Sequence, residues 1–143
     1  FNLPLLGLSP SKKENSESLR LSLSKEKKVL IAEDDPNSTL FLEEIFKTQN
    51  IEYEIAVDGK ETLTKIKENP YNLLLLDIQL PKMNGLEVAR KIRAFNNEII
   101  IIAQTANAMP KDYDKCILAG CNDYISKPLK YSLLIEKINK YFT

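Results

Sequence analysis

Short apolar runs recur along the chain, and each is bounded by polar or turn-forming residues. Leu73–Leu76 and Ile99–Ala103 are continuously apolar, as is typical of strands buried on both faces. The segment Tyr53–Val57 alternates between apolar and polar residues, which predicts a half-buried strand. With a first run at Val29–Ala32 and a short one at Tyr124–Ile125, the pattern predicts five strands.

Between these runs, apolar residues return at helical spacing. Asp35 followed by Pro36 is a typical helix start, with the acid as N-cap and the proline in the first turn. Gly120 is suited to a helix C-cap. The predicted helices begin at Pro36 and after Gly59, the second ending before Pro70, and the others cover 86–94, 110–119 and 131–141.

The strands and helices alternate, which predicts an α/β fold with a parallel sheet covered by helices on both faces. In open sheets of this kind, ligands bind outside the carboxyl ends of the strands. The residues that follow each strand are therefore the first candidates for chemistry.

The front of the chain has a different composition. Residues 9–27 are rich in Ser, Lys and Glu, which is typical of a linker. Leu19, Leu21 and Leu23 alternate within it and would allow a short strand, but exposed linker leucines are the favoured interpretation. We therefore expect one domain over 28–143, after a linker.

Composition excludes several function classes. The 143 residues carry 20 basic and 20 acidic side chains and no His. A formal charge of zero gives no electrostatic reason to expect nucleic acid or direct membrane contact, and without His the chain has neither an imidazole metal site nor a phosphohistidine. The two cysteines, Cys116 and Cys121, form neither a zinc motif nor a disulfide framework. They favour a reducing, cytoplasmic location.

The residues after the strands form one chemical set. Glu33 and Asp34 follow the first strand, Asp77 the third, Thr105 the fourth and Lys127 the fifth. Grouped carboxylates repel one another unless a cation is present, and oxygen ligands without His or Cys select Mg²⁺ or Mn²⁺ over Zn²⁺. A carboxylate can also be a nucleophile that forms an aspartyl phosphate, so the set indicates phosphoryl chemistry.

Each residue also has a simpler interpretation by itself. The acids can be helix caps or first-turn residues, Thr105 a cap, and Lys127 a solvated loop residue. Helix capping alone does not readily explain why carboxylates, a hydroxyl and an ammonium follow four separate strands. The pattern therefore favours a single site for phosphoryl chemistry.

The segment Lys28–Thr143 resembles the receiver domain of response regulators. The resemblance is carried by the phrases VLIAEDD, LLLLDIQLPKMNGLE, IIAQTANA and AGCNDYISKPL. It implies a flavodoxin-like, doubly wound sheet of order 2-1-3-4-5. This strand order is known from receivers, of which a chemotaxis receiver is an example. The order is therefore implied by the resemblance, and the residue pattern alone does not predict it.

The resemblance also implies roles for individual residues. Asp77 matches the phosphoacceptor, Glu33 and Asp34 the acidic pair that holds Mg²⁺, and Lys127 the phosphoryl-binding lysine. The backbone carbonyl of Gln79 would complete the metal ligands.

Further positions match the switch and the loops beside the site. Thr105 matches the switch hydroxyl and Tyr124 the rotating aromatic, which would alter the face formed by the helix over 110–119, the last strand and the last helix. Pro81 and Gly85 match the turn after the phosphoacceptor, where Gly85 is expected to supply a backbone geometry that other residues resist. The Lys127-Pro128 bond is expected to be cis.

The opening residues suggest a longer parent protein. Phe1-Asn2-Leu3-Pro4-Leu5 resembles the last strand of the ATP-binding domain of sensor histidine kinases, so residues 1–8 would be the end of such a domain and the parent a hybrid histidine kinase. A free-standing response regulator is the alternative. The donor would be a phosphohistidine elsewhere, and a histidine phosphotransfer protein would act downstream.

Other functions remain open at this point. The chain would be a self-phosphorylating receiver and not a turnover enzyme, but a receiver-fold docking module that is never phosphorylated is an alternative. A phosphatase of the haloacid dehalogenase type would need an Asp at position 79, where this chain has Gln79.

Overall fold

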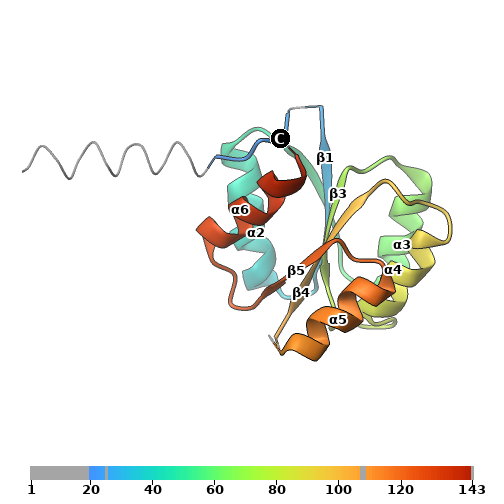
Figure 1. Cartoon of the computed structure of the whole chain (residues 1–143). Coiled ribbons are helices and arrows are strands. Elements are labelled where there is room, and N and C mark those ends of the chain that lie inside the picture. The colour runs from blue at the N-terminus through green and yellow to red at the C-terminus, as the bar shows by residue number, and fades with distance from the viewer. Residues whose placement is uncertain (1–19, 25, 107–108, 143) are drawn as a thin grey trace, which may run out of the picture.

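The computed structural model describes residues 20–24, 26–106 and 109–142. The expected kinase fragment at 1–8 lies outside these residues. The elements, labelled as in Figure 1, are β1 (Lys28–Ala32), α2 (Pro36–Thr48), β2 (Glu52–Ala56), α3 (Gly59–Glu68), β3 (Leu73–Asp77), α4 (Gly85–Arg93), β4 (Ile100–Thr105), α5 (Pro110–Ala119), β5 (Asp123–Ser126) and α6 (Tyr131–Tyr141).

The strands form one parallel sheet of order β2-β1-β3-β4-β5. Helices α2 and α6 cover one face, and α3, α4 and α5 cover the other (Figure 1). The predicted doubly wound fold and its strand order are confirmed. Every residue of β3 is buried, because this central strand has neighbours on both sides and helices above and below.

Side-chain alternation divides the apolar interior into two layers. Odd positions of β1 and β3, such as Val29, Ile31 and Leu75, pack with α2 and α6. Even positions, such as Leu30 and Leu76, pack with α3, α4 and α5. The same alternation continues to the carboxyl ends of the strands, where it determines the face on which each functional side chain lies.

The helix ends show the expected capping chemistry. The Asp35 side chain accepts a hydrogen bond from the N–H of Asn37 at 3.2 Å, and Pro36 occupies the first turn of α2. Gly120 ends α5 with a φ of 110°, which a residue with a Cβ adopts at a cost. Both predicted caps are confirmed. No helix in the described part of the chain is long and apolar enough to cross a membrane.

The end of the expected linker is packed against the domain. Leu23 is only 7% exposed and belongs to the layer under α2 and α6. The N–H of Leu21 donates to Gln49 Oε1 at 2.8 Å, and Asn139 of α6 bonds the backbone of both Arg20 and Ser22 at 2.7 Å. The expectation of exposed linker leucines is therefore wrong for Leu23, and no strand forms at residues 20–24.

Candidate functional site

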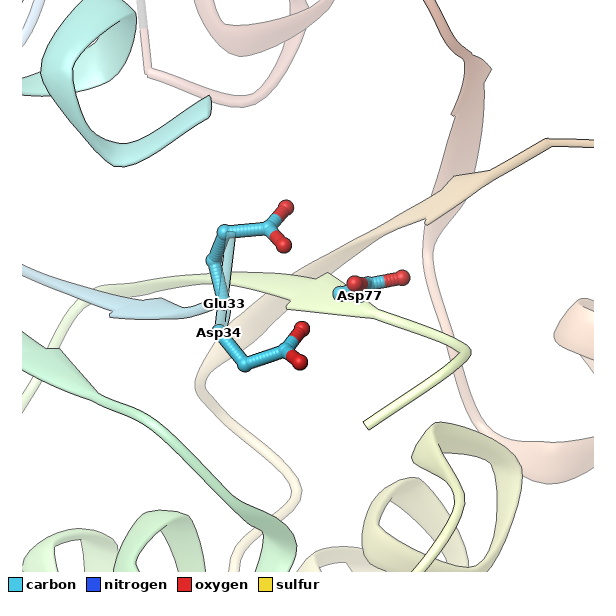
Figure 2. Close-up of side chains that lie close together, drawn as sticks. All are labelled: Glu33, Asp34 and Asp77. Atoms are coloured by element: carbon cyan, nitrogen blue, oxygen red, sulfur yellow. The ribbon is translucent and has the colours of Figure 1, made fainter. Parts of the chain in front are cut away.

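The carboxyl ends of β1 and β3 bring three acids together. Glu33 and Asp34 directly follow β1, and Asp77 is the last residue of β3. Figure 2 shows both carboxylates of the first pair turned toward Asp77. Each residue offers a carboxylate oxygen, and these oxygens lie within 4.8 Å of one another. The predicted acidic cluster is present.

Lys127 crosses from the end of β5 to this cluster. Its Nζ lies 2.9 Å from Glu33 Oε1 and 3.2 Å from Asp77 Oδ2. Glu33 is fully buried, so its carboxylate depends on this ammonium for charge compensation. The structure thus brings Lys127 and the acids together, as the sequence predicts.

Burial and charge pairing alter the pKa values of the pair. Burial raises the pKa of Glu33, and the hydrogen bond from Lys127 opposes that effect without cancelling it. Burial alone would lower the pKa of Lys127, but the hydrogen bond to Glu33 and the charge of Asp77 raise it overall. Lys127 therefore stays a cation, and Glu33 is the carboxyl that needs a positive partner.

Backbone N–H groups orient the two buried carboxylates. Asp77 Oδ1 accepts from the N–H of Gln79 at 3.0 Å, and Glu33 Oε2 accepts from the N–H of Asp35 at 3.1 Å. Each acid therefore has one oxygen bound to the backbone and the other to Lys127. This arrangement limits carboxylate rotation before any ligand binds.

The loop after Asp77 folds back closely on the strand end. The Gly85 N–H donates to the Ile78 carbonyl at 2.8 Å, and a Cβ on Gly85 would lie 2.6 Å from the backbone oxygen of Asp77. The positive φ in this loop belongs to Lys82, not to Gly85. Position 85 therefore resists other residues, as expected, but the cause is the close approach of the Asp77 and Ile78 backbone and not a positive φ.

The predicted switch residues lie at the same edge but on the other face. Thr105 ends β4 and is buried, on the α3–α5 side with Ala103. Tyr124 packs against this layer, with its ring 5.0 Å from that of Tyr113 and 5.5 Å from Lys137 Nζ. Tyr124 is thus held beside α5 and α6, away from the carboxylates. The Lys127-Pro128 bond is cis, as expected.

Sequence reasoning overlooked one residue, Gln104. It pairs with Asp77 across β3 and β4 and is fully buried. The signal was available, because Gln104 is the polar interruption between the apolar run Ile99–Ala103 and Thr105.

The donor set fits Mg²⁺. The carboxylates of Glu33, Asp34 and Asp77 supply only oxygen ligands, which hard cations prefer. The ammonium of Lys127 already bridges two of these acids, so the space between them is built for positive charge. One side of the cluster is open, because Asp34 is exposed.

Comparisons with known proteins agree with this geometry. The model of one protein family, described as the response regulator receiver domain, matches residues 29–139. The response regulator mcs4 of Schizosaccharomyces pombe is 34% identical over 141 residues, covering 79% of this chain and 27% of mcs4. Hybrid signal transduction histidine kinase L of Dictyostelium discoideum is 37% identical over 122 residues, covering 80% of this chain and 7% of the kinase. The chain thus spans under a third of each of these relatives.

Solved structures show the same fold. The receiver domain of Ssk1 from Saccharomyces cerevisiae, crystallised with the histidine phosphotransfer protein Ypd1, aligns with a TM-score of 0.79 at 32% identity, covering 84% of this chain and 91% of that one. The receiver domain of the Pseudomonas aeruginosa sensor histidine kinase PA1611, with a magnesium ion coordinated in its active site cleft, aligns with a TM-score of 0.74 at 30% identity, covering 81% and 97%.

Proposed function

Because the chain belongs to the response regulator receiver family, we propose that Asp77 accepts a phosphoryl group from a phosphohistidine in a Mg²⁺-dependent reaction. The observation that carries the proposal is the contact of Lys127 with both Glu33 and Asp77 beside the exposed Asp34. This arrangement supplies a nucleophile, a metal site and a fixed cation at one edge of the sheet.

The residues of the chain have distinct parts in the transfer. An Asp77 oxygen forms the new bond to phosphorus while the phosphorus–nitrogen bond to the donor imidazole breaks. The N–H of Gln79 holds the other Asp77 oxygen, and Lys127 and the Thr105 hydroxyl stabilise charge on the transferred oxygens. Mg²⁺ or Mn²⁺, held by Glu33, Asp34, Asp77 and the Gln79 carbonyl, would neutralise that charge further. With no His in the chain, the donor lies on another segment or protein.

A groove beside the site supports docking of a helical donor or acceptor. It has a volume of about 490 Å³ and adjoins the site through Lys127. Its walls are largely apolar at Phe41, Pro128 and Leu129 and polar at Asn37 and Ser38. We propose that a histidine phosphotransfer domain binds here, as a downstream partner or as the donor. The Ssk1 receiver crystallised with Ypd1 supports this assignment.

Phosphorylation would be read out at the β5 edge of the sheet, where helices from both faces meet. The added group brings about −1.5 to −2 charges at pH 7. Thr105 would bond the phosphoryl group, and Tyr124 would leave its contact with Tyr113 and turn inward. The surface of α5, β5 and α6 would then shift between two populations.

We further propose that the parent is a hybrid histidine kinase and acts in the cytoplasm. The kinase relatives from Dictyostelium discoideum support the first point, and the free thiols of Cys116 and Cys121 support the second. A free-standing regulator is the alternative, and the similarity to the response regulator mcs4 supports it. A kinase catalytic domain encoded upstream of Phe1 would decide between them.

The direct test is labelling with a small phosphodonor. The chain is incubated with Mg²⁺ and acetyl phosphate, and the intact mass is measured. We expect the mass of one phosphoryl group on the wild type and on Asp112→Asn, a control acid in α5, but none on Asp77→Ala. Equal labelling of Asp77→Ala, or no labelling of the wild type, would contradict the proposal.

A further inference from the structure

A buried amide lies next to the phosphoacceptor without a partner. Gln104 is fully buried, and among the described residues neither its Oε1 nor its Nε2 has a hydrogen-bond partner. Native proteins rarely leave buried polar groups unpaired, because the lost hydration is not recovered. The two unpaired atoms therefore require a physical explanation.

The sheet register places this amide beside Asp77. Gln104 is the Cα partner of Asp77 on β3 and of Ile125 on β5. Its side chain points to the same face as that of Ile102, which packs in the α2 and α6 layer. Asp77 is two residues after Leu75 on β3, so its side chain points to the same layer as that of Leu75.

Lys127 extends across the position of Gln104. It follows β5, yet its Nζ contacts Asp77 at the end of β3. Because β4 lies between β5 and β3, the lysine side chain crosses β4 on the face that Gln104 occupies. The amide therefore lies on the same face of the sheet that the Lys127 side chain crosses to reach Asp77.

We propose that Gln104 Oε1 accepts the Lys127 ammonium when Mg²⁺ engages Glu33 and Asp77. This inference rests on the proposed function. Ammonium and metal would compete for the carboxylates of Glu33 and Asp77, which become poorer acceptors once they bind the metal. The amide oxygen is an uncharged acceptor on the same face that does not compete with the metal. Gln104 is a positioning residue, since it acts through Lys127.

In this arrangement the unpaired amide of Gln104 favours metal binding. Without the metal, Lys127 is held by Glu33 and Asp77, and the amide remains unpaired. With the metal, the amide gains its partner. A group that destabilises the metal-free state and stabilises the bound state increases the affinity for the metal.

The test compares Gln104→Met with Ile102→Met, a control on the same strand and face but outside the site. The thermal midpoint is measured without divalent ions, and the Mg²⁺ dissociation constant by NMR titration without a phosphodonor. For Gln104→Met we expect a higher midpoint and roughly tenfold weaker Mg²⁺ binding, the scale of one hydrogen bond to a charged group. Ile102→Met should leave Mg²⁺ binding unchanged.

Two results would overturn the inference. One is wild-type Mg²⁺ affinity in Gln104→Met, and the other is equally weakened binding in Ile102→Met, which would indicate packing alone. Gln104→Leu provides a second apolar variant if the first does not fold. In the ¹⁵N spectrum, Mg²⁺ should shift the Lys127 ammonium signal in the wild type but much less in the apolar variants. If the wild type neither binds Mg²⁺ nor accepts phosphoryl, the proposed function itself fails.

Discussion

Replacing Lys127 by Met removes the ammonium that separates two buried carboxylates. Its Nζ is 2.9 Å from Glu33 and 3.2 Å from Asp77, and hydrogen bonds to charged groups contribute about 1.5–3 kcal/mol each. Breaking a fully buried ion pair costs about 3–5 kcal/mol. Because the Lys127 side chain is 25% exposed, we expect Lys127→Met to lower the free energy of unfolding by about 2–4 kcal/mol without divalent ions.

Mg²⁺ should reverse much of this loss. A divalent ion among the carboxylates replaces the missing positive charge, and no ammonium competes for their oxygens. The variant should therefore bind Mg²⁺ more tightly than the wild type. A ligand at a hundred times its dissociation constant stabilises the folded state by about 2.7 kcal/mol. Urea denaturation with and without Mg²⁺, together with calorimetric titration, measures both effects. Phosphorylation by acetyl phosphate should nevertheless be strongly reduced.

Lys137→Met is the matched control. Lys137 also bonds a buried acid, Asp123, at 3.0 Å, but at the start of β5 and outside the cluster. Its loss of stability should be the same with and without Mg²⁺. The reasoning fails if Lys127→Met behaves like this control, or if it binds Mg²⁺ more weakly than the wild type.

Three other substitutions test separate parts of the structure. Gly85→Ala forces a Cβ to within 2.7 Å of backbone atoms, so urea denaturation should show a loss of about 2 kcal/mol or more, with weaker Mg²⁺ binding in the same preparation. Hydrogen bonds from Lys28 and Tyr71 lower the pKa of Glu54 to about 2, so its stabilisation is present above its usual pKa and lost as pH falls toward 2. Glu54→Gln should flatten the stability–pH curve below about pH 4.5, and an unchanged slope would refute this. Leu23→Ala should cost about 2 kcal/mol and speed amide exchange at residues 20–24, whereas a free linker would show neither effect.

Much of the fold could be predicted because its signals are local. The continuous runs at β3 and β4 identify buried strands, and Asp35, Pro36 and Gly120 mark helix ends by their own chemistry. The alternation of strands and helices predicts a parallel sheet, and the residues that follow its strands then meet at the carboxyl edge. Asp77 and Lys127 were therefore placed together although 50 residues separate them.

The parts that could not be predicted depend on distant contacts. The burial of Leu23 depends on α2 and α6, and the bond from Asn139 to the segment before β1 spans more than a hundred residues. The reason for glycine at position 85 is the nearby backbone of Asp77, which local sequence does not encode. Gln104 was visible as a polar interruption, but its lack of a partner is a property of the packed interior.

The alternation of side chains on β4 has a wider consequence. Gln104 and Thr105 are neighbours in sequence, yet one faces the acid cluster and the other faces the layer that holds Tyr124. Strand β4 therefore connects the acid cluster on one face of the sheet with the Tyr124 layer on the other. Any displacement of the β4 backbone would move both side chains together and so affect both faces of the sheet at once.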